Sequence, residues 1–160
     1  MARKLLEGWQ LDWIGTLQSG RSLAVTSNVN TTQSQGGGQR PNSTGNSAKL
    51  DGPVPERLNR YFDVTQFVNP APFQFGNLSR TLPDVSGPEW HVWDISIIKN
   101  TRIRENLRFQ LRGEAFNVLN RPVFANPGLE FGTASFGRIN AVADRANPAR
   151  QIMLGAKLIW

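Results

Sequence analysis

Four stretches of the chain alternate between apolar and polar residues, which is the pattern of a β-strand with one apolar face. They cover residues 8–19, 90–101, 106–118 and 150–160. In the last stretch one side carries Ile152, Leu154, Ala156, Leu158 and Trp160, and the other carries Gln151, Met153, Gly155, Lys157 and Ile159. The pattern predicts an all-β fold, an antiparallel meander of about four long strands.

The two sides of these predicted strands differ most in charge. On the apolar side the only charged residue is Lys99, at a strand end where a long side chain can reach a polar boundary. The other side carries Asp12, Asp94, Arg108, Arg112, Glu114 and Lys157. The apolar side also holds the large aromatic residues Trp9, Trp13, Trp93, Phe109 and Trp160. A sheet with one face on a core would explain the alternation alone, but aromatic residues near strand ends are typical of strands that face lipid.

The predicted connections are of two very different lengths. The link at 101–106 is short and predicts an antiparallel hairpin, whereas loops 20–89 and 119–149 are each about thirty residues or longer. Outer-membrane barrels have this asymmetry, with short periplasmic turns and long external loops. We therefore expect a segment of a large transmembrane β-barrel, with the hairpin periplasmic and both long loops extracellular.

Within the first long loop, composition changes along the chain. Residues 28–51 are polar and low in complexity, so we expect them to be exposed and mobile. Residues 53–88 are rich in proline and aromatics, which predicts a segment folded on itself or against a neighbour, with one helical turn at 55–59.

Composition excludes several classes of protein. The chain of 160 residues has a net charge of +6, but its basic residues are scattered, so nucleic-acid binding is not expected. No apolar run is long enough for a spanning helix. The absence of cysteine excludes a disulfide scaffold and a thiolate zinc site.

Candidate chemistry is equally sparse. His91 is the single histidine, and no nucleophile motif is present. Asp94 and Glu114 on neighbouring strands could form a paired-carboxylate site. Because Arg108 and Arg112 share their side, we favour a network of opposite charges. We expect no enzyme, no catalytic residue, no cofactor and no metal site.

A family resemblance rests on stretches that cover most of the chain in a fixed order. They are Gly8–Asp12 with Leu17–Arg21, Tyr61–Asp63 with Phe73–Asn77, Arg80–Pro88, Trp93–Asn100, Phe109–Asn117 and the terminal strand. In this order they resemble the C-terminal end of the barrel of a TonB-dependent outer-membrane receptor. The resemblance is to the large Oar-like type, which has a carboxypeptidase-regulatory-like N-terminal domain.

The resemblance implies a location in the bacterial outer membrane and a role in transport of large or scarce solutes. It implies that the apolar side meets lipid and that the charged side lines the lumen around a plug domain. The terminal strand resembles the signal read by the barrel-assembly machinery, with Gly155, Leu158 and Trp160 at its glycine, hydrophobic and aromatic positions. Met153 stands where a polar residue is usual, and Trp160 where phenylalanine is commoner.

Such receptors carry some twenty-two strands, a plug and a TonB-contacting segment, so we expect this chain to be a fragment, or a truncated reading frame, of a longer protein. Contact with TonB would then occur only through that missing N-terminal part. Two alternatives remain open from the sequence. One is a membrane anchor whose barrel assembles from several chains, and the other is a soluble β-sandwich binding module.

Overall fold

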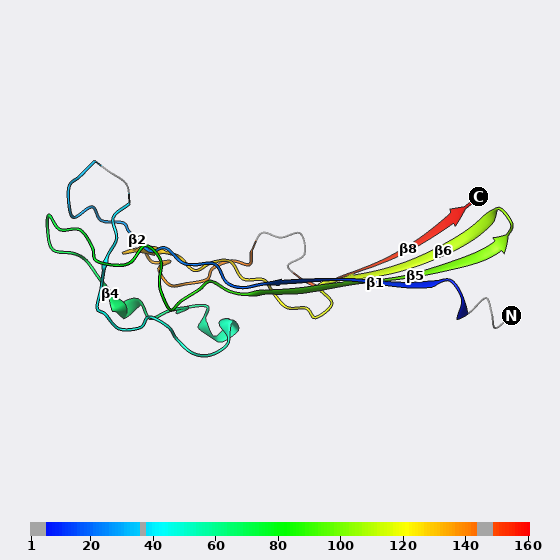
Figure 1. The fold of residues 1–160 in the computed structure, drawn as a ribbon, viewed down its shortest axis with the longest axis horizontal. Helices are drawn as coiled ribbons and strands as arrows, with labels where there is room; N and C mark the ends of the chain where they lie inside the picture. Colours follow the sequence, from blue (N-terminus) through cyan, green and yellow to red (C-terminus); the bar gives the residue numbers. More distant parts are fainter. Residues whose placement is uncertain (1–5, 36–37, 144–148) are drawn as a thin grey trace. The chain divides into compact units, whose positions relative to one another are not determined.

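The computed structural model describes residues 6–35, 38–143 and 149–160, so parts of the predicted segments 28–51 and 119–149 lie outside the described residues. The chain divides into two compact units, each described by itself (Figure 1). The sheet unit comprises Met1–Gln18, Trp90–Val123 and Asp144–Trp160. The loop unit comprises Ser19–Glu89 and Phe124–Ala143.

The sheet unit contains one antiparallel sheet of four strands. Its strands are β1 (Trp9–Gln18), β5 (Trp90–Arg104), β6 (Leu107–Phe116) and β8 (Gln151–Ile159), in the spatial order β1-β5-β6-β8. Each strand is antiparallel to its neighbour. The predicted all-β class and antiparallel meander are therefore confirmed.

The β5–β6 hairpin is tighter than the sequence suggested. The predicted link at 101–106 is wrong, because β5 continues to Arg104 and leaves only Glu105 and Asn106 between the strands. Thr101 pairs with Phe109, and the register shifts between Arg102 and Arg104. Polar residues suggested a loop at this point, but threonine and isoleucine favour extended backbone, and charged side chains are tolerated at an exposed strand end.

The loop unit is held together by short elements. The strands β2 (Thr26–Ser27) and β7 (Glu130–Phe131) pair in parallel, and β3 (Asn42–Ser43) pairs with β4 (Phe67–Val68) in antiparallel fashion. Two 3-10 helices, η1 (Val54–Arg57) and η2 (Val64–Gln66), complete the unit. The helical turn expected at 55–59 corresponds to η1, which begins one residue earlier, directly after Pro53.

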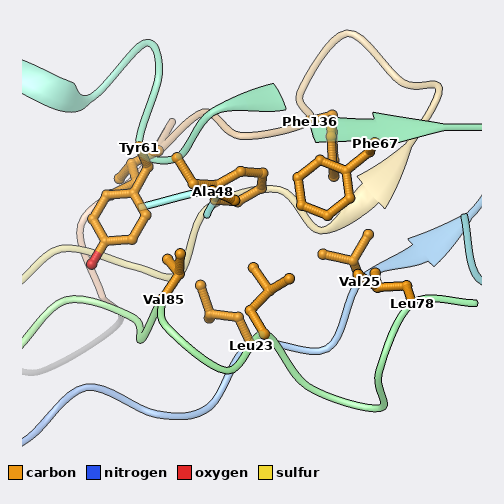
Figure 2. Packing of buried hydrophobic residues seen from close by; sticks show 11 residues of the cluster. Leu23, Val25, Ala48, Tyr61, Phe67, Leu78, Val85 and Phe136 are labelled. Atoms are coloured by element: carbon orange, nitrogen blue, oxygen red, sulfur yellow. The ribbon is translucent and has the colours of Figure 1, made fainter. Parts of the chain in front are cut away.

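A hydrophobic core lies inside the loop unit (Figure 2). Phe62 is completely buried, and its ring meets those of Phe67 and Phe136 edge to face, with centroids 5.7 and 5.2 Å away. The core consists of Leu23, Val25, Ala48, Tyr61, Phe62, Phe67, Leu78, Leu82, Val85, Phe136 and Ile139. The two long loops thus fold together, and the expectation that residues 53–88 fold against a neighbour is confirmed.

The expectation of an exposed segment at 28–51 is wrong for part of it. Pro41 and Ala48 are buried, and the backbone N–H of Thr44 donates to the Gln66 carbonyl. The amide oxygen of Asn77 accepts from the Ser43 N–H at 2.8 Å. The reason is that asparagine and serine satisfy backbone groups directly, so a polar sequence can be built into a folded unit without contributing large apolar side chains.

Candidate functional site: a two-faced sheet

The register of the sheet sorts its side chains into two sets. Residues directly opposite each other in an antiparallel pair lie on the same face. One row across the sheet consists of Trp13, Ile95, Ala115 and Ile152, and the adjacent row consists of Asp12, Ser96, Glu114 and Met153. We call the face with the first row the apolar face and the face with the second row the polar face.

The apolar face collects all the strand residues that the sequence assigned to one side. From β1 to β8 its large members are Trp9, Leu11, Trp13, Leu17, Trp93, Ile95, Ile97, Phe109, Leu111, Ile152, Leu154 and Leu158. Several project far into the surroundings, with Leu154 83% and Trp13 65% exposed. The packed hydrophobic cluster of the described residues includes none from the sheet unit, in which Ile98 and Val123 are buried apart from it. So much contiguous exposed apolar surface marks a face that meets a non-aqueous partner.

Two aromatic arrangements organise this face. The rings of Trp13 and Trp93 stack, with centroids 5.5 Å apart and planes 17° from parallel. Trp93 lies directly opposite Gly15, where a Cβ would come within 3.1 Å of the indole, so glycine leaves room for the ring. The ammonium group of Lys99 lies 5.1 Å from the centroid of the Trp9 ring and donates to the Glu7 carbonyl. The charge of Lys99 on the apolar face is thereby paired with an aromatic ring.

The polar face holds several charged side chains that take part in hydrogen bonds. The Arg112 guanidinium donates to the Glu114 carboxylate at 2.6 Å. The Asp94 carboxylate accepts the Asn117 backbone N–H at 2.8 Å, and the Asp12 carboxylate accepts from the Gln10 amide at 3.0 Å. These contacts orient each carboxylate through a hydrogen-bond donor, the arrangement of a structural network.

An open cavity of about 160 Å³ lies on the polar face. Its lining includes Asp12, Asp94, Ser96, Arg112 and Glu114. The structure therefore brings four of the six predicted polar-face residues together. Arg108, which pairs with Arg102, and Lys157, which pairs with Gln110, lie on the same face but do not line the cavity.

The geometry does not support the paired-carboxylate alternative. Glu114 lies opposite Ser96 and is paired with Arg112, whereas Asp94 is engaged by the backbone of Asn117. Within the described residues no group of three or more histidine, cysteine, aspartate or glutamate side chains could hold a metal ion.

Two residues around Asp94 escaped the sequence reasoning. Ser96 has a buried hydroxyl without a hydrogen-bond partner in the described part of the chain. Asn117 is completely buried, and its side chain exchanges hydrogen bonds with the backbone of Arg121 at 2.9 and 3.1 Å. Alternation alone places Ser96 beside Asp94, but burial of Asn117 arises from a turn with positive φ that no local pattern revealed.

The outer strands of the sheet have open edges. Among the described residues β1 pairs only with β5, and β8 pairs only with β6. Of the predicted assembly residues, Gly155 and Leu158 lie in β8, where Leu158 is opposite Phe109, and Trp160 directly follows the strand. Their role in assembly stays a prediction. Open edges of long strands are sites for pairing with further strands.

Comparison with protein families decides the setting of this sheet. The model of a family described as "Outer membrane beta barrel domain" matches residues 1–153. The chain belongs to this family. Its members lie in the bacterial outer membrane, and the two-faced sheet is accordingly a segment of an outer-membrane β-barrel. The soluble β-sandwich alternative is therefore wrong.

Other comparisons add no relative. Searches of curated proteins and of solved structures found no match to the chain. The described residues contain no helix long and apolar enough to cross a membrane. The family match ends at Met153, so most of β8, including Gly155 and Leu158, lies beyond the matched residues.

Proposed function

We propose that this outer membrane β-barrel segment belongs to a TonB-dependent, receptor-like transporter. The observation that carries the proposal is the contrast between the faces of one sheet, since the polar face holds an oriented set of charges and the apolar face is exposed. A barrel wall has one apolar face and one polar face when it separates lipid from a polar interior. The stretches that resemble Oar-like receptors support the more specific assignment.

Each part of the chain has a defined role in this proposal. The apolar face contacts lipid, with Trp9, Trp93 and Trp160 near the membrane boundaries. The polar face lines the lumen and contacts a plug domain. The β5–β6 turn is periplasmic, and the loop unit is extracellular. Strand β8 serves barrel closure and, through Gly155, Leu158 and Trp160, recognition by the assembly machinery. The proposal assigns no catalytic residue and no cofactor.

The open edges of β1 and β8 require further strands, because four strands cannot close around a lumen. In a TonB-dependent receptor these strands belong to the same longer polypeptide. In a multi-chain anchor they come from other copies of the chain. The open edges fit both arrangements, so the two are separated by the size of the polypeptide that forms the barrel.

Purification from the native outer membrane tests the proposal. We expect peptides of this chain to come from a single heat-modifiable polypeptide far larger than 17.8 kDa, which also contains an N-terminal plug and co-purifies with TonB. Mass spectrometry of the excised band identifies these parts. A detergent-resistant oligomer built from 17.8 kDa chains would contradict the transporter and support the multi-chain anchor.

A further inference from the structure

Two phenylalanines of the loop unit project outward while others form its core. Phe73 is 72% exposed and Phe75 is 74% exposed, whereas Phe62, Phe67 and Phe136 are buried. Core packing accordingly does not explain the presence of these two rings. Exposed aromatic side chains held close together in a chain are instead a common feature of binding surfaces.

The backbone conformation at Phe73 is unusual for a phenylalanine. The Gln74 N–H donates to the Ala71 carbonyl at 3.1 Å, so Pro72 and Phe73 occupy the two central positions of a tight turn. Phe73 has a φ of 63°, and turns that need a positive φ at the second central position usually have glycine there. A bulky residue in this conformation is strained, and its exposed ring gains no burial in return.

A second loop fixes this turn in place. The Phe73 N–H donates to the Thr31 carbonyl at 2.7 Å, and the Thr31 hydroxyl donates to the Gln74 carbonyl at 3.0 Å. The Thr31 loop is itself closed, because the Asn30 amide donates to the Ser34 carbonyl at 2.8 Å. The two loops therefore hold the backbone of the turn that carries Phe73 in place, which lowers the entropic cost of binding a ligand.

The two segments that form this surface carry no charge. Residues 22–35 and 64–79 contain no Asp, Glu, Lys or Arg, although 19% of the chain is charged. Gln33 and Gln74 are exposed, and their side-chain amides make no hydrogen bond within the described part of the chain. Arg40 is one cation beside these segments, because its backbone lies against Gly76. Exposed aromatic rings and exposed amides in two uncharged segments suit a ligand that is neutral and rich in hydroxyl groups.

We propose that Phe73 and Phe75, with the amides of Gln33 and Gln74, form a binding surface for a neutral oligosaccharide. The C–H faces of sugar rings stack on aromatic rings, and sugar hydroxyls exchange hydrogen bonds with amides, which both donate and accept. A charged ligand would find no complementary charge in either segment. This binding does not depend on transport, so it stands or falls separately from the TonB-dependent function.

Equilibrium binding to the full chain tests the proposal. The chain is kept in amine-oxide detergent micelles, because glycoside detergents would compete, and is titrated with maltohexaose, cellohexaose and mannohexaose. We expect at least one of these neutral probes to bind. We expect Phe73→Gly and Phe75→Ala each to weaken binding about tenfold, the loss of one aromatic stacking contact. Val142→Ala, at another exposed position of the loop unit, should leave binding unchanged.

The variants separate binding from folding. Phe73→Gly supplies the residue that the positive φ favours, so its thermal stability should equal or exceed that of the parent chain. Phe73→Tyr should retain binding, because the ring is kept. The proposal is overturned if no neutral probe binds, or if Phe73→Gly and Phe75→Ala bind as well as Val142→Ala. Preferential binding of oligogalacturonate that is lost in Arg40→Gln would also overturn it, because the ligand would then be an anion.

Discussion

The two units of this chain place their apolar residues in opposite ways. The loop unit buries Leu23 and Phe62 completely, around a core of its own. The sheet unit turns Leu154 and Trp13 outward and holds its strands together through backbone pairing. The hydrophobic effect in water stabilises the first arrangement. The second becomes favourable only when lipid replaces water at the apolar face. The loop unit is thus suited to water, and the apolar face of the sheet unit is suited to lipid.

The distribution of natural fluorophores allows each unit to be observed separately. All five tryptophans lie in the sheet unit, at positions 9, 13, 90, 93 and 160, and the single tyrosine, Tyr61, lies in the loop unit. Tryptophan emission therefore reports on the sheet and its environment. Hydrogen exchange of backbone amides in residues 19–89 and 124–143 reports on the loop unit.

The largest effect is expected from Phe62→Ala. Removing a completely buried ring leaves a cavity among Phe67, Phe136 and Gly137, which we expect to cost about 3–5 kcal/mol of loop-unit stability. Hydrogen exchange in the loop unit should accelerate in proportion. Tryptophan emission in lipid vesicles should not change, because the ring is not part of the sheet unit.

Phe75→Ala is the matched control, since it removes the same ring from an exposed position. It should change loop-unit stability by no more than about 0.5 kcal/mol. Equal acceleration of exchange by the two variants would show that the loop unit does not depend on its core. A shift of tryptophan emission in Phe62→Ala alone would show that the two units do not fold independently.

The next largest effect concerns the sheet. Leu154 and Met153 are adjacent in β8, both are exposed, and they lie on opposite faces. Leu154→Arg should destabilise the membrane-inserted form by about 2–4 kcal/mol if the residue lies near the bilayer centre. Met153→Arg should have little effect, because it places the cation on the polar face opposite Glu114. Urea unfolding from lipid vesicles, followed by tryptophan emission, measures both.

This pair of variants tests the assignment of the faces directly. If Met153→Arg destabilises the inserted form more than Leu154→Arg, the lipid-facing and lumen-facing sides have been exchanged. If neither variant has an effect, β8 does not contact lipid. In both variants hydrogen exchange in the loop unit should match that of the parent chain.

The sheet could be predicted from the sequence because its information is local. Alternation of period two within β1, β6 and β8 gave the two faces, and the observed register places all the chosen phases on matching faces. Arg112 and Glu114 are two residues apart on one strand, so their contact also follows from alternation. The predicted end of β5 was wrong because the polar residues at the end of this strand resemble a loop in composition.

The loop unit could not be predicted in the same way. Its core joins Leu23 to Phe136, residues more than a hundred positions apart, and the two long strands β5 and β6 lie between them in the sequence. No periodicity marks which of its aromatic residues are inside. Phe62 and Phe75 both lie in the segment 53–88, which is rich in proline and aromatics, yet one is buried and the other exposed. Burial here is decided by tertiary contacts rather than by local pattern.

The smallest effect is expected at Asp63, which caps η2 in the loop unit. Its carboxylate accepts hydrogen bonds from the side chain of Gln66 at 2.9 Å, from Arg60, and from the side chain and N–H of Thr65. These hydrogen bonds, that of Gln66 first, hold the pKa of the Asp63 carboxyl well below its usual range. The ionised form is thus favoured in the folded state.

The sign of the pH dependence follows from this lowered pKa. Stabilisation by Asp63 is fully present above the unfolded-state pKa of about 4 and is lost as pH falls from there through the lower folded-state pKa. We expect the urea midpoint of the loop unit, measured by hydrogen exchange, to fall between pH 5 and pH 3, both values being about one unit from that pKa. Asp63→Asn, which cannot ionise, should flatten this dependence while leaving the sheet unit in lipid unchanged. If Asp63→Asn leaves the pH profile unaltered, the acid sensitivity of the loop unit belongs to another carboxylate. The difference in pH dependence between the two units would then not come from Asp63.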